Sequence, residues 1–176
     1  MNAAELAVLL ARLAGVADEA GAVLRRSAFS ANIKERADCS VALFTPAGEV
    51  LVQAEHIPVH LGSMPAAVGA VIEALGPLPA AVQAVVNDPF AGGTHLNDLT
   101  LVAPAYLGDA LVGWVATRAH HADVGGAAPG SLPADATHIA QIIGRMVRSP
   151  LAHRVATDDT LNSVACYLPK FDREAL

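Results

Sequence analysis

The feature that most limits the fold of this chain is a series of short apolar runs, each bounded by proline, glycine or polar residues. Runs of this length, rich in branched aliphatic side chains and separated by turn residues, are typical of β-strands that pair in a sheet. The runs cover residues 39–44, 50–53, 82–86, 99–103 and 111–117. Residues 45–49, Thr-Pro-Ala-Gly-Glu, are suited to a hairpin turn between the first two runs.

Two helices are predicted beside this sheet. Asn2 followed by Glu5 forms a capping-box pattern, after which apolar residues recur at helical spacing for about 20 residues. A second apolar stripe begins with Pro65 and ends at Gly76, which is typical start and stop chemistry for a helix. The chain is therefore expected to be an α+β protein, with a mixed or antiparallel sheet, an N-terminal helix and at least one further packed helix.

The composition limits both the side chains that can fill the core and the kinds of partner that the chain can bind. Hydrophobic residues make up 53% of the chain, but 37 of its 176 residues are alanine and only 4% are aromatic, so small and branched side chains must fill the core. The net charge of −6 argues against a nucleic-acid-binding surface. The longest stretch without a charge, residues 56–72, contains two prolines and two histidines, so we expect no membrane span. No signal sequence or disulfide framework is indicated, and we expect a cytoplasmic protein.

The most unusual chemistry lies in two polar, glycine-rich loops that follow predicted strands. The first contains His95-x-x-Asp98, an imidazole and a carboxylate that converge if the backbone turns between them. A second imidazole, from His120 or His121, would complete a set of two nitrogens and one oxygen. Such a set suits Mn, Fe or Zn and leaves coordination positions open. The same spacing also fits side chains that only cap turns and satisfy loop amides.

Other polar residues also allow a functional and a structural interpretation. Cys39, beside His56 and His60, could act as a thiolate nucleophile, but it opens an apolar strand, as small buried hydrophobic residues do. The two histidines are interpreted as structural. Residues 27–38 are predicted to be a loop, and the charges at 32–36 could bind an anion, although such runs are typically solvated or ion-paired. No phosphate-binding loop is present, so another chain would have to hold any nucleotide.

Four blocks of the sequence carry a more specific signal. They are NIKERADCSVALFT at 32–45, QAEHIPVHLGSMPA at 53–66, NDPFAGGTHLNDLTLVA at 87–103, and RAHHADVGGA at 118–127 followed by Pro129-Gly130-Ser131. In this order the blocks resemble the hydantoinase B family, which includes the B-type half of 5-oxoprolinase and related subunits of acetone and acetophenone carboxylases. The resemblance covers about residues 2–139.

The resemblance implies a divalent metal site. The positions that match the family's ligands are His95, Asp98 and His120, with His121 as the residue that could be confused with His120. Asp123 is a further candidate, as a carboxylate that orients a ligating histidine by accepting its other N–H.

The resemblance also implies a partner and a reaction. An A-type hydantoinase subunit would bind ATP and phosphorylate the carbonyl oxygen of the substrate, and water would then attack the activated carbonyl. The chain is thus expected to be the metal-bearing B-type subunit of an ATP-dependent cyclic-amide hydrolase, in a hetero-oligomer. One alternative is a subunit of an ATP-dependent ketone carboxylase. Another is a truncated, non-catalytic remnant or interaction module.

The resemblance to the family ends at about residue 139, before the end of the chain. Residues 1–139 are interpreted as a hydantoinase B-like N-terminal region and residues 140–176 as a divergent tail. Family subunits are considerably longer than 176 residues, so the expected fold is an incomplete N-terminal lobe of the family fold. The tail keeps no clear apolar period and contains Pro150, so it is predicted to contribute little to the main core.

Overall fold

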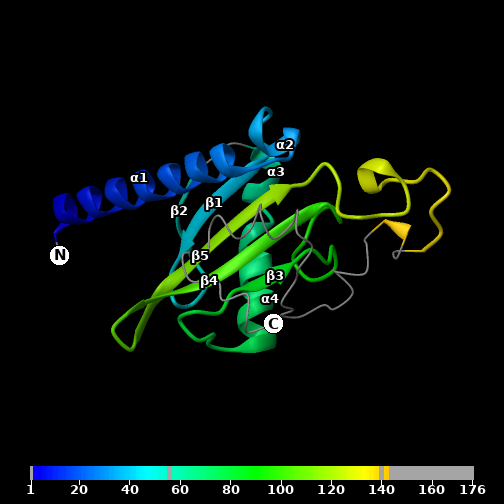
Figure 1. The fold of residues 1–176 in the computed structure, drawn as a ribbon. Coiled ribbons are helices and arrows are strands. Elements are labelled where there is room, and N and C mark those ends of the chain that lie inside the picture. Colours follow the sequence, from blue (N-terminus) through cyan, green and yellow to red (C-terminus); the bar gives the residue numbers. More distant parts are fainter. Residues whose placement is uncertain (1, 55–56, 139–140, 143–176) are drawn as a thin grey trace.

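The fold is one antiparallel sheet with helices on both faces (Figure 1). The structure, a computed structural model, describes residues 2–54, 57–138 and 141–142. Its strands follow the order β2-β1-β5-β4-β3, which confirms the expected α+β class. The elements are α1 (Ala3–Ser27), α2 (Ala31–Lys34), β1 (Cys39–Phe44), β2 (Val50–Ala54), α3 (Pro58–Leu61), α4 (Met64–Leu75), β3 (Ala84–Val86), β4 (Asp98–Leu107), β5 (Ala110–His120) and the 3-10 turn η1 (Pro129–Ser131).

The alternation of side chains along the strands builds a separate core on each face. In β1, Ala42 and Phe44 belong to the cluster that packs under α4. Cys39 and Val41, which point to the opposite face, pack with Ala17 and other residues of α1. Because neighbouring residues of a strand point to opposite faces, one short strand contributes to both cores.

The predicted hairpin joins β1 and β2. The N–H of Thr45 donates to the carbonyl of Glu49 at 2.7 Å, and the N–H of Gly48 donates to the carbonyl of Thr45 at 2.9 Å. Gly48 has a φ of +87°, a left-handed conformation that glycine adopts without steric penalty. The turn chemistry read from residues 45–49 is therefore confirmed.

The second hairpin, formed by β4 and β5, is longer than predicted. The apolar run at 99–103 stops before Pro104, a residue that normally ends a strand. In the structure β4 continues through Pro104, which lies opposite Trp114 of β5. The neighbouring strand β3 pairs only with residues 100–102, so β4 is an edge strand at Pro104. Proline is tolerated at an edge because no ladder bond is lost on that side.

The segment 27–38, which was predicted to be a loop, contains the one-turn helix α2. The carbonyl of Ser30 accepts hydrogen bonds from the N–H groups of Ile33 and Lys34 at 3.1 and 2.9 Å. Ile33 is 1% exposed and belongs to the core under α1. Burial of this single apolar side chain explains the turn of helix within an otherwise charged segment.

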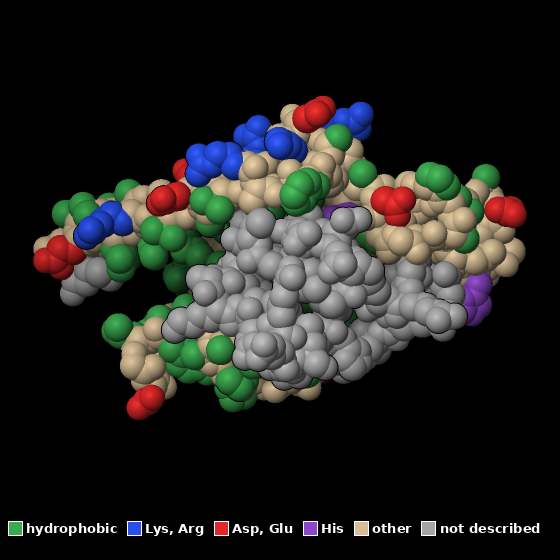
Figure 2. All heavy atoms as spheres, viewed as in Figure 1, with side chains coloured by type: hydrophobic (Ala, Val, Ile, Leu, Met, Phe, Trp, Pro, Cys, Tyr) green, Lys and Arg blue, Asp and Glu red, His purple; other side chains and the backbone are tan. Residues whose placement is uncertain are grey.

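Helix α1 begins with the predicted capping box. The N–H of Glu5 donates to Oδ1 of Asn2 at 2.9 Å, and the N–H of Asn2 donates to Oε2 of Glu5 at 2.8 Å. The buried residues of α1 all lie in its C-terminal half, while its N-terminal half extends past the sheet (Figure 1). Figure 2 shows apolar side chains along this projecting part. The large exposed ones are Leu6, Val8, Leu9 and Val16.

One segment is apolar enough to satisfy a test for membrane spans by length and composition. Residues Pro58–Leu75 have a mean hydropathy of 1.2 over 18 residues. The structure divides this segment into α3 and α4, and the side chains of Met64, Val68 and Val71 pack into the core against the sheet. A core helix of a globular domain passes the same test, so the segment is weak evidence for a membrane span.

Two predictions from the sequence concern residues that the structure does not describe. They are the structural role of His56 and the divergent tail at 140–176, of which only residues 141–142 are described.

The loop before β4 depends on a close approach that only glycine permits. Gly92 has a φ of +83°, and a Cβ at this position would lie 2.4 Å from the backbone nitrogen of Ala67. We expect Gly92→Ala to lower the free energy of unfolding by at least about 2 kcal/mol, through left-handed strain and overpacking. The matched control is Gly69→Ala in α4, where no atom lies within 4 Å of the new Cβ.

The control variant should gain about 0.5–1 kcal/mol, because alanine favours helix more than glycine does. Urea denaturation measures both changes. A Gly92→Ala variant as stable as the unmodified protein would contradict the described packing of this loop.

Candidate metal centre

The face of the sheet under α4 changes from apolar to polar along its length. Trp114 lies between Phe44 and Pro104 in one row of paired residues, and Ala116 lies between Ala42 and Val102 in the next. The following two rows are polar. They contain Arg118 between Ser40 and Thr100, and then His120 opposite Asp98. The candidate site therefore lies where the apolar core ends and the strands open into loops.

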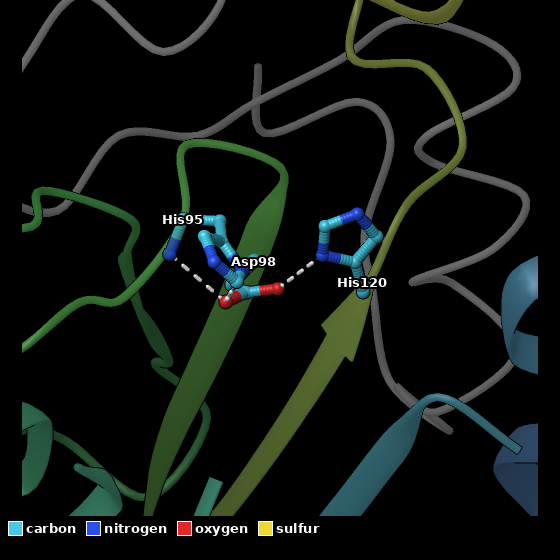
Figure 3. Close-up of side chains that lie close together, drawn as sticks. All are labelled: His95, Asp98 and His120. Atoms are coloured by element: carbon cyan, nitrogen blue, oxygen red, sulfur yellow. Dashed lines mark hydrogen bonds and ion pairs between the residues drawn. The ribbon is translucent and has the colours of Figure 1, made fainter. Parts of the chain in front are cut away.

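Three of the residues singled out in the sequence meet at this end of the sheet (Figure 3). The Asp98 carboxylate lies between two imidazole rings, with Oδ1 2.7 Å from Nδ1 of His120 and Oδ2 3.3 Å from Nδ1 of His95. One ligand atom from each residue lies within 4.8 Å of the other two. The ring centroids of the two histidines are 5.6 Å apart, with the rings nearly perpendicular.

The backbone explains why these side chains converge. Asp98 is the first residue of β4 and His120 the last of β5, and the two are directly paired in register. His95 lies in the preceding loop, where a tight turn is closed by the N–H of Asp98, which donates to the carbonyl of His95 at 3.0 Å. The His95-x-x-Asp98 spacing thus spans one turn that faces the end of β5.

Asp98 is held as a carboxylate although it is fully buried. Burial by itself raises the pKa of Asp98, but hydrogen bonds from the Thr94 hydroxyl, the His95 N–H and the His120 ring outweigh it and lower the pKa. The His95 N–H donates to Oδ2 at 3.0 Å, and the Thr94 hydroxyl donates to the same oxygen. A buried, ionised carboxylate between two imidazoles is the form that a cation would require.

The donor set fits a divalent transition metal. Two nitrogens and one carboxylate oxygen match the preferences of Zn, Mn and Fe. Ligand atoms bound about 2.1 Å from one metal lie about 3 to 3.5 Å apart, and one ligand atom from each of these three residues lies within 4.8 Å of the other two. The side chain of His95 is 65% exposed and that of His120 25% exposed, so the cluster is open to solvent on one side.

The structure distinguishes between the two adjacent histidines, a choice that the sequence spacing leaves open. His120 faces Asp98, whereas the backbone of His121 pairs with Asn97, whose side-chain amide donates to the His121 carbonyl at 3.0 Å. His121 is 8% exposed, and burial lowers its pKa to about 4. The geometry brings His120 into the cluster and leaves His121 in the interior.

Asp123 lies in the loop that follows β5. Its carboxylate accepts hydrogen bonds from the N–H groups of Gly125 and Gly130 at 2.7 and 2.9 Å, and from the Ser131 hydroxyl at 2.7 Å. The Ser131 hydroxyl, followed by these two amides, lowers the pKa of Asp123. The contacts described for Asp123 hold the loop together, and none of them reaches a histidine of the cluster.

Cys39 and His60 are both built into the interior, whereas the charged side chains of Lys34, Glu35 and Arg36 are exposed. Burial raises the pKa of Cys39 to about 11, so its thiol stays protonated near neutrality and is a poor nucleophile. Nδ1 of His60 lies 3.0 Å from the Ser40 hydroxyl and Nε2 lies 3.6 Å from an Asp38 carboxylate oxygen. His60 is 1% exposed and burial lowers its pKa.

Sequence reasoning missed two residues that support the site, Thr94 and Arg118. Thr94 lies in a polar, glycine-rich loop, where a threonine is common and gives no signal of its own. Arg118 is fully buried, which is rare for arginine. The available signal was its place two residues before His120, because residues i and i+2 of a strand share a face.

The burial of His121 makes the free energy of unfolding depend on pH. Because the pKa of His121 is about 4, the folded protein keeps this ring neutral, whereas the unfolded chain binds a proton below about pH 6.5. Between these values the unfolded state binds more protons. Acidification should therefore lower the free energy of unfolding by up to about 1.4 kcal/mol per pH unit through this group.

We expect His121→Gln to show a shallower loss of stability than the unmodified protein between about pH 6.5 and about pH 4. Urea denaturation in a chelator-containing buffer measures both slopes. Equal slopes would show that His121 is not held neutral by burial.

Comparisons with known proteins agree on one family. The model of the hydantoinase B/oxoprolinase family matches residues 2–142. The chain is 44% identical to 5-oxoprolinase 1 of Arabidopsis thaliana over 130 residues, which are 73% of this chain and 10% of that protein.

Two solved structures share the fold. An ATP-dependent caprolactamase from Pseudomonas jessenii superimposes with a TM-score of 0.72 at 25% identity, over 99% of this chain and 31% of that one. An acetone carboxylase in its nucleotide-free form gives a TM-score of 0.64 at 26% identity, over 72% of this chain and 17% of that one.

The likeness is specific but covers a small part of each relative. The chain spans between 10% and 22% of the length of the curated relatives considered. The family match nevertheless extends over most of this chain and contains the whole His95, Asp98 and His120 cluster. The chain belongs to the hydantoinase B/oxoprolinase family.

Proposed function

We propose that this chain is the metal-bearing part of a B-type subunit of an ATP-dependent cyclic-amide hydrolase. The observation that carries the proposal is the convergence of His95, Asp98 and His120 at the open end of the sheet. It is supported by the likeness to a 5-oxoprolinase and to a caprolactamase, proteins whose names denote action on cyclic amides.

Each residue has a defined part in this proposal. Asp98 supplies a carboxylate that Thr94 and the His95 N–H keep ionised. His120 is oriented by its contact with Asp98, and His95 completes the set from the solvent side. A divalent metal held by these three groups would supply a Lewis acid for a carbonyl or phosphoryl oxygen, or for water.

The proposal divides the chemistry between two polypeptides. An amide carbonyl is a poor electrophile, and phosphorylation of its oxygen by an ATP-binding, A-type subunit would make attack by water feasible. The chain itself has no phosphate-binding loop, and neither of its lysines, Lys34 and Lys170, follows a glycine-rich turn. The exposed apolar half of α1 offers a surface for assembly into a hetero-oligomer. Such a complex would work in the cytoplasm.

The likeness to an acetone carboxylase favours a second candidate, a subunit of an ATP-dependent ketone carboxylase. In that reaction CO2 derived from bicarbonate replaces water as the partner of the activated substrate. ATP turnover that requires bicarbonate in the reconstituted complex would favour the carboxylase, and turnover without bicarbonate the hydrolase. A complex that never turns over ATP would point to a non-catalytic remnant or interaction module.

The metal content of the purified chain tests the proposed ligand set. The purified chain, loaded with Mn, Zn or Fe and freed of excess metal, should retain about one ion per chain, because three ligands converge on one point. His95→Ala and His120→Ala should each lose most of this metal, as measured by elemental analysis. The control is His121→Ala, which removes a neighbouring histidine outside the cluster and should keep its metal. Equal metal in all four proteins would rule out this ligand set.

The activity of the isolated chain tests the proposed division of the chemistry between two polypeptides. The chain alone should neither hydrolyse ATP nor open a cyclic amide, and any turnover should appear only when an A-type subunit is added. Release of phosphate and ring opening measure the two steps separately. ATP turnover by the pure chain that is abolished in His95→Ala would contradict the proposed division of labour.

A further inference from the structure

Arg118 is the largest fully buried side chain in the described part of the molecule. A buried charge is costly unless it is paired or fully hydrogen-bonded. None of the ion pairs found among the described residues involves Arg118. Its charge is therefore compensated by neutral acceptors and by the nearby carboxylate of Asp98, whose field acts on the guanidinium through space.

The three guanidinium nitrogens reach three separate parts of the chain, namely β4, the loop before β4 and the residue that precedes α4. Nε donates to the Thr100 hydroxyl of β4 at 2.7 Å, and Nη2 donates to the carbonyl of Gly92 at 2.9 Å. Nη1 donates to the hydroxyl of Ser63, at the start of α4. The planar fork of arginine holds these directions at once, which a lysine ammonium on a flexible stem does not reproduce.

These contacts frame the candidate metal centre. Arg118 precedes His120 by two residues in β5, and Thr100 follows Asp98 by two residues in β4, so all four side chains share one face. Gly92 lies in the loop that carries His95. One guanidinium thus links β4 and β5, which carry Asp98 and His120, to the loop that carries His95.

We propose that Arg118 is a positioning residue, which fixes the loop of His95 against Asp98 and His120 so that the three side chains meet. The inference rests on the proposed function for its consequence in metal binding, but its structural content concerns the metal-free chain. Without the Gly92 contact, residues 94–97 keep their hydrogen bonds to Asp98 and His121, whereas the part of the loop around Gly92 is left with hydrogen bonds inside the loop and its packing on α4.

The first test follows amide hydrogen exchange in the metal-free protein by NMR. The probes are the N–H groups of Ala91 and Gly93, which both donate to the carbonyl of Asp88 within the loop. Arg118→Lys should speed their exchange by about tenfold or more, because a charge-assisted hydrogen bond to the loop is lost. The N–H of Gly48, in the distant β1–β2 turn, should exchange at its original rate.

Two further variants complete this test. Arg12→Lys makes the same substitution on exposed α1 and should leave both loop amides unchanged. Thr100→Val removes one acceptor while keeping the arginine, and should speed exchange in the same direction by a smaller factor. This variant decides the question if Arg118→Lys does not fold. Unchanged loop exchange in the folded variants would overturn the proposal.

The second test measures the affinity for Zn²⁺ by competition with a chelator. Arg118→Lys should weaken binding by about 10- to 100-fold, as loss of groups that orient metal ligands does, with Arg12→Lys unchanged. Equal affinity in Arg118→Lys and the unmodified protein would overturn the positioning role and leave the metal site standing. An unmodified protein that binds no Zn²⁺ would count against the proposed function, and the exchange result would still decide the role of Arg118 in the loop.

Discussion

The register between β4 and β5 is the constraint on which the rest of the site depends. This register places Asp98 opposite His120 and Thr100 opposite Arg118. A slip of one residue would turn the side chains of one strand to the other face, and the cluster would not form. The tight turn at Gly108 and the apolar row around Trp114 hold the register, so core packing at one end of the hairpin determines the chemistry at the other.

The polar end of the sheet is stable because its buried charges are compensated. Asp98 and Arg118 are both fully buried, and hydrogen bonds to neutral groups surround each of them. The Asp98 carboxylate acts on Arg118 through space and opposes the lowering of its pKa by burial, without a direct contact between the two groups. Such a pair is better suited to holding a precise arrangement than to adding stability, since removing either partner leaves a buried charge uncompensated.

Local signals in the sequence predicted local structure well. The capping box at Asn2 and the turn at 45–49 depend only on neighbouring residues, and both appear in the structure. The helix α2 and the continuation of β4 through Pro104 depend on tertiary context, on a buried Ile33 and on the end of β3, which no local pattern reveals. For the same reason spacing alone left the choice between His120 and His121 open, whereas strand pairing separates the two rings.

The proposed function requires that His95, Asp98 and His120 hold one metal ion. The most direct measurement is an anomalous difference map from crystals of the chain grown with Mn²⁺ or Zn²⁺. We expect one strong peak about 2.0–2.2 Å from a nitrogen of each histidine and from an oxygen of Asp98. Well-ordered side chains at this position with no peak between them, or a peak bound by other residues, would contradict it.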